Sequence, residues 1–229
     1  LEIDFEPIDL SLERRRAGAA AAYDEVVASL ARTRLGLKYP TVTEGESPNA
    51  VLRTRLGLSV IHRPVHSIPG IASSFKETVA LEIVRVATGG TYDDPGQRIG
   101  QDVAVSLRII ERRPCTEAAR FAFRLARSRP RKRLTVVTKS NAQRHAMVMW
   151  DEIAAQVARE FPDVRWDKEL VDAATARMVN RPASLDTIVA TNLHADILSD
   201  LAAALAGSLG IAPSGNIDPE HRYPSMFEP

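Results

Sequence analysis

Cysteine is nearly absent from the chain, whose 229 residues include only Cys115. A single cysteine excludes an intramolecular disulfide and any zinc or iron–sulfur site built from the cysteines of one chain. Structural disulfides are typical of oxidising compartments, so their absence favours a reducing one. We therefore expect a cytoplasmic protein whose chemistry relies on other side chains.

Net charge and long apolar runs are also lacking. Thirty basic residues are balanced by 29 acidic ones, and a formal charge of +1 provides no long-range field for nucleic acid or membrane. No apolar run approaches the roughly 20 residues that span a bilayer. Residues 1–4 lack the basic and apolar regions of a signal peptide. We expect a soluble protein with neither a nucleic-acid nor a membrane partner.

A basic stretch at residues 127–133 is the one local exception, with five basic side chains in seven positions. It is compatible with a nucleic-acid patch or a localisation signal. It also joins the end of an expected helix to an expected strand, and cations near a helix C-terminus interact favourably with the macrodipole. We favour a solvated turn as the simpler interpretation.

Hydrophobic residues make up 45% of the chain and charged residues 26%, which is typical of a globular protein with a buried core. Short runs rich in Val and Ile alternate with longer segments of helical spacing, a pattern that predicts an α/β fold. The expected strands are residues 3–8, 35–38, 60–65, 81–86, 103–110, 134–138, 164–171 and 187–191. The expected helices are residues 17–30, 116–127, 142–160, 173–179 and 196–205. Loops are expected around residues 47–49, 89–96 and 213–216.

Two carboxylates, Asp196 and Asp200, lie at the start of an expected helix. Residues four apart share a helix face, so both side chains point the same way. Like charges at this spacing repel, more strongly among Ile197, Leu201 and Leu205, so a positive group should lie between them. Two interpretations stay open: solvated carboxylates near a helix start, or oxygen ligands of a hard divalent cation, Mg²⁺ or Mn²⁺.

Several further motifs occur along the chain in a characteristic order. They are SPNAVLR at 47–53, RP at 63–64, IVR at 83–85 before TGG, SRPRK at 128–132, TKSN at 138–141, MWDE at 149–152, NLHADILSDL at 192–201, GIAPSGN at 210–216 and YPSMFEP at 223–229. With these motifs the chain resembles the isocitrate, isopropylmalate and tartrate (D-malate) dehydrogenases, a family of metal-dependent β-decarboxylating dehydrogenases.

The resemblance implies an arginine-rich substrate site. The equivalents of Arg53, Arg63 and Arg85 hold the substrate's carboxylates in the family, and a guanidinium group suits this task because it binds carboxylate in a bidentate fork. Ser47 and Asn49 match residues that help to receive an additional acidic arm. Without the family, each arginine is equally compatible with a surface position.

The resemblance also implies a metal site shared between subunits. Asp196 and Asp200 match two carboxylates that bind Mg²⁺ or Mn²⁺, and Asp172 matches a third from the other subunit. Lys139 matches a lysine that crosses the same interface and assists deprotonation of the hydroxyl, so Lys139 and Asp172 are the expected catalytic residues. Asn141 matches a residue near the nicotinamide of NAD or NADP. Two half-sites of this kind require a homodimer.

The implied architecture consists of two interleaved α/β domains of the isocitrate/isopropylmalate dehydrogenase type. Residues 1–58 and 208–229 are expected to form the larger domain and residues 59–207 the smaller central one. An arm at about residues 89–105 is expected to clasp a second subunit, and the active site to lie between the domains. The family's first strand and its C-terminal cofactor loop are expected to fall outside these 229 residues.

Three positions depart from the family pattern. A tyrosine that helps to protonate the enolate in the family is matched, in our alignment, by Ile110, which has no proton to give. His62 and His194 also replace other residues of the pattern: the family's Asn-Leu-Phe-Gly-Asp is here Asn-Leu-His-Ala-Asp at 192–196. Each histidine is compatible with a polar site residue or with a structural role.

The implied reaction is the oxidation, with β-decarboxylation, of a 2-hydroxy acid that bears a 3-carboxylate. Residues 47–53 resemble the isocitrate branch and the C-terminal half resembles the tartrate/D-malate branch, so an isocitrate-like or tartrate-like acid is expected. The alternative is a noncatalytic or regulatory subunit that binds a carboxylate ligand. The missing tyrosine favours this alternative, whereas the presence of Lys139, Asp172, Asp196 and Asp200 argues against it.

Overall fold

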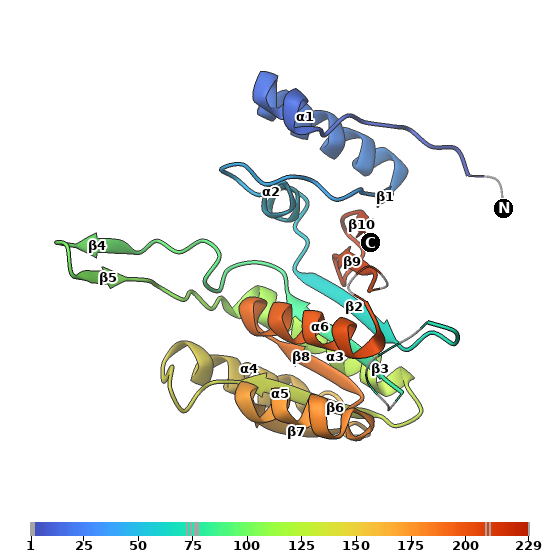
Figure 1. Cartoon of the computed structure of the whole chain (residues 1–229), viewed down its shortest axis with the longest axis vertical. Coiled ribbons are helices and arrows are strands. Elements are labelled where there is room, and N and C mark those ends of the chain that lie inside the picture. The colour runs from blue at the N-terminus through green and yellow to red at the C-terminus, as the bar shows by residue number, and fades with distance from the viewer. Residues whose placement is uncertain are drawn as a thin grey trace.

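The computed structural model describes residues 3–71, 73, 75, 78–208, 210 and 212–228. Its main feature is an eight-stranded sheet with the order β1-β10-β9-β2-β3-β8-β6-β7 (Figure 1). The strands of this sheet are β1 (Leu35–Leu37), β2 (Val60–His66), β3 (Ala80–Val86), β6 (Arg133–Thr138), β7 (Arg165–Leu170), β8 (Thr187–Ala190), β9 (Ser214–Ile217) and β10 (Ser225–Glu228). The helices are α1 (Leu12–Thr33), α2 (Pro48–Arg55), α3 (Arg112–Ser128), α4 (Ala146–Ala158), α5 (Val171–Asn180) and α6 (Asn192–Ala206), with a short 3₁₀ turn at Pro182–Ser184.

Strand directions divide the sheet into a parallel part and a mixed part. Strands β3, β8, β6 and β7 are parallel, whereas β2 pairs antiparallel with both β3 and β9. Strand β1, from the N-terminal part of the chain, pairs with β10 from the C-terminal part. The hydrogen-bonded ladder continues from these strands through β9 into β2. The predicted α/β class is confirmed, and the division into two domains stays a prediction; its boundary residues 1, 2 and 229 lie outside the described residues.

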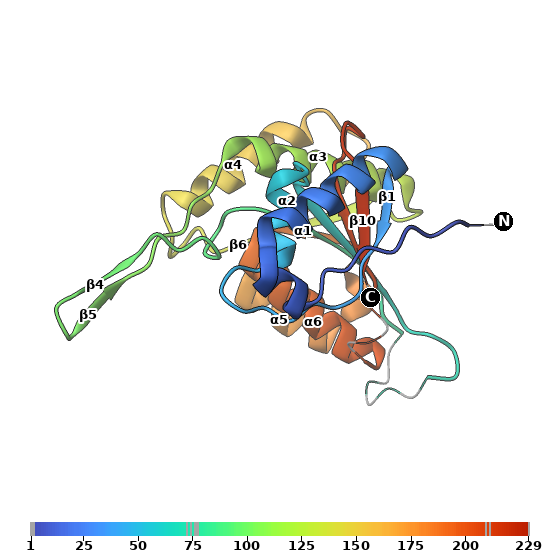
Figure 2. The ribbon, with the colours of Figure 1, turned by 90° about the horizontal axis from the view of Figure 1, so that it is seen from above.

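Helices cover both faces of the parallel part of the sheet. Figure 2 shows α3 and α4 on one side and α5 and α6 on the other. Adjacent valines of β6 illustrate why both sides are apolar: Val136 packs in the cluster with Phe123 and Trp150, and Val137 packs in the cluster with Leu198. Parallel strands buried on both faces have this nearly continuous apolar sequence. At the other end of the sheet, α1 and α2 cover β10 through a third cluster.

An arm projects from this body between β3 and α3 (Figures 1 and 2). It is the antiparallel pair β4 (Gln97–Ile99) and β5 (Val103–Val105), which Gly100 connects in a left-handed conformation with φ +67°. Its apolar side chains Ile99 and Val103 are 54% and 52% exposed. The expected arm is therefore present, but the strand expected at residues 103–110 ends at Val105. A lone two-stranded ribbon with exposed apolar residues needs a covering surface.

Three other expectations about local structure were wrong. Residues 3–8 form no strand; Phe5 is 72% exposed, and no neighbouring strand satisfies the backbone. The expected loop at Ser47 instead begins α2, because Pro48 occupies the first helical turn, where its missing N–H costs nothing. Part of the loop expected at residues 213–216 is strand β9, whose central Gly215 pairs with both β2 and β10.

The basic stretch at residues 127–133 is largely neutralised within the chain. Its ion pairs are Arg129 with Glu82 and Asp186, Lys132 with Asp163, and Arg133 with Asp167. Arg131 instead donates to the backbone carbonyls of Ala183 and Leu185. These contacts connect the end of α3 to β3, β7 and β8, which agrees with a structural turn. Among the described residues, no helix combines the length and apolarity needed to cross a bilayer.

Truncating Trp150 is expected to be strongly destabilising. The side chain has no exposed surface, and its indole Nε1 donates to the carbonyl oxygen of Val137 at 3.0 Å. We expect Trp150→Ala to lower the free energy of unfolding by about 3–5 kcal/mol, since it leaves a cavity and removes the indole hydrogen bond to Val137. Urea denaturation measures this change. The control is Val148→Ala on the same helix, where the side chain is 37% exposed; equal losses in the two variants would contradict the expectation.

Candidate active site

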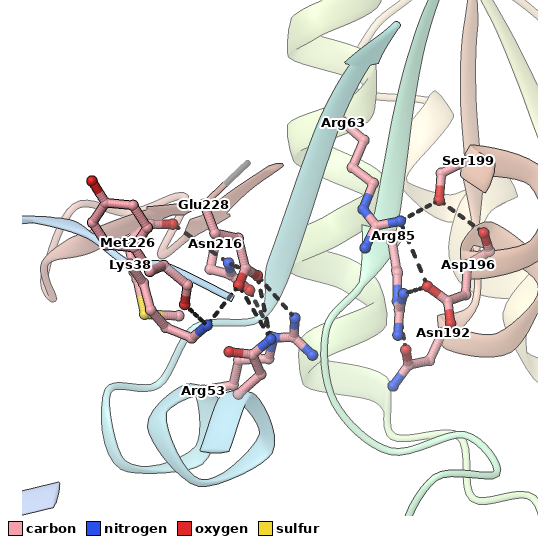
Figure 3. A network of polar contacts seen from close by, with 12 residues as sticks. Lys38, Arg53, Arg63, Arg85, Asn192, Asp196, Ser199, Asn216, Met226 and Glu228 are labelled. Carbon is pink, nitrogen blue, oxygen red and sulfur yellow. Dashed lines mark hydrogen bonds and ion pairs between the residues drawn. The ribbon is translucent and has the colours of Figure 1, made fainter. Parts of the chain in front are cut away.

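The candidate site lies where α6 crosses the start of β2 and the end of β3. In the β2–β3 ladder Ile61 is opposite Arg85 and Arg63 is opposite Ile83. Alternation therefore directs both arginines to the same face, the one covered by α6. Helix α6 presents residues four apart, Asp196 and Asp200, to this face (Figure 3 labels Asp196 beside the two arginines). Strand register and helix periodicity thus bring the predicted arginines and aspartates together.

Ion pairs connect these groups directly. Arg85 donates through Nε to Asn192 Oδ1 at 2.7 Å and pairs through Nη1 with Asp196 Oδ1. Arg63 Nη1 lies 3.2 Å from Asp200 Oδ1 and 3.7 Å from Asp196 Oδ1. The positive group expected between the two aspartates is therefore Arg63 in this structure.

The three predicted substrate arginines influence one another. Burial lowers the pKa of Arg85 to about 10, with Tyr92 opposing the shift and Arg53 and Arg63 adding to it. Burial also lowers the pKa of Arg53, although Glu228 stabilises its charged form. Desolvation and mutual repulsion both destabilise guanidinium charge. This part of the site therefore favours anions.

Arg53 belongs to a second network beside the first (Figure 3). Its Nε donates to Asn216 Oδ1 at 2.7 Å, and its Nη2 lies 3.7 Å from Glu228 Oε1. Glu228 also pairs with Lys38 at 3.1 Å and accepts from Asn49 Nδ2 at 3.2 Å. Burial raises the pKa of Glu228, but Lys38, Asn216 and Arg53 outweigh it, so this pKa lies below its usual value. The predicted Asn49 is therefore part of the network.

Residues Lys38, Asn216 and Glu228 were not predicted as site residues. The sequence did contain a sign of their role, because each is a polar residue in a short apolar or strand-like run. Ser47 was predicted, and the structure places it at the N-cap of α2, where its side chain makes no capping hydrogen bond. It thus lies two residues from Asn49 without a contact of its own in the network.

Lys139 and Asp172 form a separate pair. Lys139 follows β6 and donates to Asp172, in the first turn of α5. The hydrogen bond from Lys139 lowers the pKa of the Asp172 carboxyl. Across the described ranges, no three His, Cys, Asp or Glu residues converge as a metal site. One chain therefore does not bring Asp172 together with Asp196 and Asp200; Asn141 lies exposed in the turn after β6.

A tyrosine is present at the site, although not at the position that the sequence analysis assigned. The Tyr92 hydroxyl donates to Asp196 Oδ2, and the Arg85 guanidinium lies 5.2 Å from the centre of the Tyr92 ring. Ile110 instead is half-buried against the core cluster that contains Phe123. The match of Ile110 to the family tyrosine stays a prediction. Tyr92 is the only aromatic residue between Arg85 and Ile110, which is the signal that was overlooked.

The two unusual histidines have different environments. His62 Nε2 lies 2.6 Å from Glu82 Oε2, on the sheet face opposite the arginines, which supports a structural role. His194 is 7% exposed, and its Nε2 lies 3.2 Å from Arg108 Nη1. Burial, followed by the charges of Arg108 and Lys139, lowers the pKa of His194 to about 4. The imidazole of His194 is therefore neutral at neutral pH.

An apolar groove of about 470 Å³ lies elsewhere on the sheet. Its lining includes Leu37, Pro64 and Phe227. In the ladders, His62 is opposite Gly215 and Gly215 is opposite Phe227, so the groove occupies the face opposite Arg63 and Arg85. Lys38 and Glu228 also line the groove, so it borders the network of Arg53.

Comparison with known families identifies this arrangement. The sequence model of the isocitrate/isopropylmalate dehydrogenase family matches residues 1–229. The chain belongs to the isocitrate/isopropylmalate dehydrogenase family. The resemblance stated from the motifs is thereby confirmed. A solved isocitrate dehydrogenase from Methylococcus capsulatus has the same fold, with a TM-score of 0.84 at 33% identity over 95% of this chain and 66% of that one.

Two curated relatives show how far the sequence similarity extends. A probable tartrate dehydrogenase/decarboxylase of Agrobacterium vitis is 59% identical over 175 residues, 73% of this chain and 49% of the relative. A decarboxylating D-malate dehydrogenase of Escherichia coli K12 is 42% identical over 175 residues, 73% of this chain and 48% of the relative. The chain spans about half the length of these relatives.

Proposed function

We propose that this isocitrate/isopropylmalate dehydrogenase family member oxidises, with β-decarboxylation, a 2-hydroxy acid that bears a 3-carboxylate. The supporting observation is the convergence of Arg63 and Arg85 on Asp196 and Asp200, with Arg53 in the neighbouring network. Similarity to tartrate and D-malate dehydrogenases supports a tartrate-like or malate-like acid, and the motif at residues 47–53 supports an isocitrate-like one. The proposal includes a homodimer, the predicted two-domain division and a cytoplasmic location.

Arg53, Arg63 and Arg85 would bind the substrate's carboxylates. Each guanidinium group now contacts a carboxylate of the protein: Glu228, Asp200 and Asp196, respectively. A bound acid would replace these contacts with bidentate hydrogen bonds of its own. Ser47 and Asn49, at the start of α2, would face an additional substituent of the acid.

The carboxylates of one chain supply part of a site for a divalent metal ion. Asp196 and Asp200 offer oxygen ligands on one helix face, and the cationic Arg63 nitrogen lies within 4 Å of both. Oxygen ligands suit Mg²⁺ or Mn²⁺. We propose that these carboxylates hold such an ion with Asp172 of the partner subunit. A bound ion would acidify the substrate hydroxyl and stabilise negative charge on its oxygen after oxidation.

Lys139 and Tyr92 would move the protons. Lys139, reaching across the dimer from the partner subunit, would accept the proton of the substrate hydroxyl. After carbon dioxide leaves, a proton must return to the carbon that bore the 3-carboxylate. The Tyr92 hydroxyl is available for this step because it lies in the cluster, beside Arg85 and Asp196. This hydroxyl supports an enzyme over a noncatalytic subunit.

NAD or NADP would accept the hydride, and Asn141 remains the proposed contact for the nicotinamide. The apolar groove lies on the sheet face opposite Arg63 and Arg85, two of the arginines that would hold the substrate. We therefore assign no residue of the groove to hydride transfer.

The test is an assay of the purified protein. With Mn²⁺ and either NAD⁺ or NADP⁺, we expect it to reduce the nucleotide in the presence of isocitrate, D-malate or tartrate, and to release carbon dioxide. Inactivity with all three acids, together with intact binding of Mn²⁺, would support the noncatalytic subunit instead.

Replacing Tyr92 by phenylalanine should separate proton donation from substrate binding. We expect Tyr92→Phe to lower kcat by about 100-fold or more, because general acid catalysis is lost while the ring over Arg85 remains. The KM for the acid should change little. Steady-state kinetics with Mn²⁺ measure both constants.

The control for Tyr92→Phe is Ile110→Val, which changes the residue that the alignment had matched to the tyrosine. This variant should retain a kcat close to that of the unmodified protein, since Ile110 packs in the core. A large loss of kcat in Ile110→Val with none in Tyr92→Phe would reverse the assignment.

A further inference from the structure

Arg108 is a partly buried cation that forms no ion pair with the residues that the structure describes. Its Nη1 contacts His194 Nε2 at 3.2 Å and the Met147 sulfur at 3.5 Å, and neither contact is with a carboxylate. Its Nε is buried and has no hydrogen-bond partner in the described part of the chain. Arg53, Arg63 and Arg85, by contrast, each contact a carboxylate. A desolvated guanidinium group without a counter-ion is costly, so an anion at Arg108 would be stabilising.

His194 contributes a second unused donor. A guanidinium group can only donate, so the Nε2 atom that faces Arg108 must act as the acceptor. The proton of this ring is then on Nδ1. This Nδ1 atom is buried and has no partner among the described residues. An unpaired buried donor costs roughly 1–3 kcal/mol. Two neighbouring side chains thus each have a buried N–H group that lacks an acceptor.

A short series of contacts connects this pair to the substrate arginines. Ile109, next to Arg108, exchanges two backbone hydrogen bonds of 2.8 Å with Gly90. A Cβ atom on Gly90 would lie 3.2 Å from Asn192 Cβ, and Asn192 accepts from Arg85. Arg85 contacts Asn192 and Arg108 contacts His194, so both arginines touch the first turn of α6. The N-terminal end of a helix adds favourable potential for an anion.

We propose that Arg108, oriented by His194, binds a third carboxylate of the substrate, in addition to those held by the three substrate arginines. The inference rests on the proposed function and narrows its substrate class to tricarboxylic 2-hydroxy acids. The family pattern has an apolar phenylalanine at the position of His194, so this polar pair is a departure of the present chain. Arg108 is thus a specificity-determining residue and His194 a positioning residue.

Calorimetric binding of two unreactive acids tests the proposal. Tricarballylate has three carboxylates and glutarate has two. We expect the unmodified protein to bind tricarballylate about 10- to 100-fold more tightly, as one additional charge-assisted contact implies. Arg108→Gln should remove this preference and leave the affinity for glutarate unchanged. The matched control is Arg112→Gln, which removes an exposed arginine four residues away and should preserve the preference.

Variants of His194 distinguish positioning from a purely structural role. His194→Phe, which restores the family residue, should weaken binding of tricarballylate alone, and His194→Gln should restore part of it because its amide oxygen can accept from Arg108. If Arg108→Gln does not fold, Arg108→Lys provides the test, since it keeps the charge but loses the planar fork.

The outcomes separate this inference from the proposed function. Equal affinity of the unmodified protein for the two acids overturns the inference and leaves the proposed function intact. A preference for tricarballylate that persists in Arg108→Gln also overturns it. Failure of both acids to bind overturns the inference and the proposed function together.

Discussion

Replacing both Asp196 and Asp200 by asparagine is expected to abolish the stabilisation of the protein by Mn²⁺. A ligand present at 100 times its dissociation constant stabilises the folded state by about 2.7 kcal/mol. For a chain of this size, that corresponds to a rise of roughly 5–10 °C in Tm. Neutral amides offer Mn²⁺ far weaker ligands than carboxylates, so this rise should disappear. We also expect kcat to fall by about 1,000-fold or more, since the hydroxyl is no longer acidified.

The measurement must separate metal binding from loss of the internal ion pairs. The double variant leaves Arg63 and Arg85 without their aspartate partners, which lowers Tm even without metal. The informative quantity is therefore the difference in Tm with and without Mn²⁺, measured for each protein. Asp163→Asn, which removes a surface partner of Lys132, is the control and should keep the full metal-induced rise. An unchanged rise in the double variant would exclude this site.

Mixing two inactive variants is expected to restore activity. Lys139 and Asp172 pair with each other, separate from Asp196 and Asp200, as expected if each active site combines halves of two subunits. Lys139→Met and Asp196→Asn homodimers should each lose nearly all turnover. After subunits exchange at equal amounts, half of the dimers are hybrids, and one of the two sites in each hybrid is intact. The mixture should therefore recover about a quarter of the original activity.

A second mixture provides the matched control. Lys139→Met and Asp172→Asn both alter the half-site that serves the partner, so every site in their hybrids contains one lesion. This mixture should recover nothing, although its subunits exchange in the same way. Equal recovery in the two mixtures, or none in either after demonstrated exchange, would contradict shared sites.

The parts of the fold that could be predicted are those with strong periodicity. Strands β6 and β8 are short apolar runs buried on both faces, and α6 has clear helical spacing, so each was expected near its observed position. Short elements could not be predicted in this way. Helix α2 has eight residues and begins at a proline, and β9 contains polar Ser214 and Asn216, whose role depends on β2, β10 and Arg53.

The candidate site could be predicted only where the family motifs assign roles. Arg63, Arg85, Asp196 and Asp200 converge as expected, because strand register and helix spacing follow from the sequence. Tyr92 was overlooked, since its approach to Asp196 depends on the path of the arm and not on a local pattern. The same limitation applies to the contact between Arg108 and His194, which are 86 residues apart in the chain.

The position of Arg63 between Asp196 and Asp200 has a thermodynamic consequence for ligand binding. An acid that binds Arg63 competes with the ion pairs of this arginine and leaves two carboxylates short of positive charge. A cation bound by these carboxylates in turn releases Arg63 and Arg85 for an anion. Each ligand thus removes a competitor of the other, and the enhancement is reciprocal: the factor by which the metal tightens the acid equals the factor by which the acid tightens the metal.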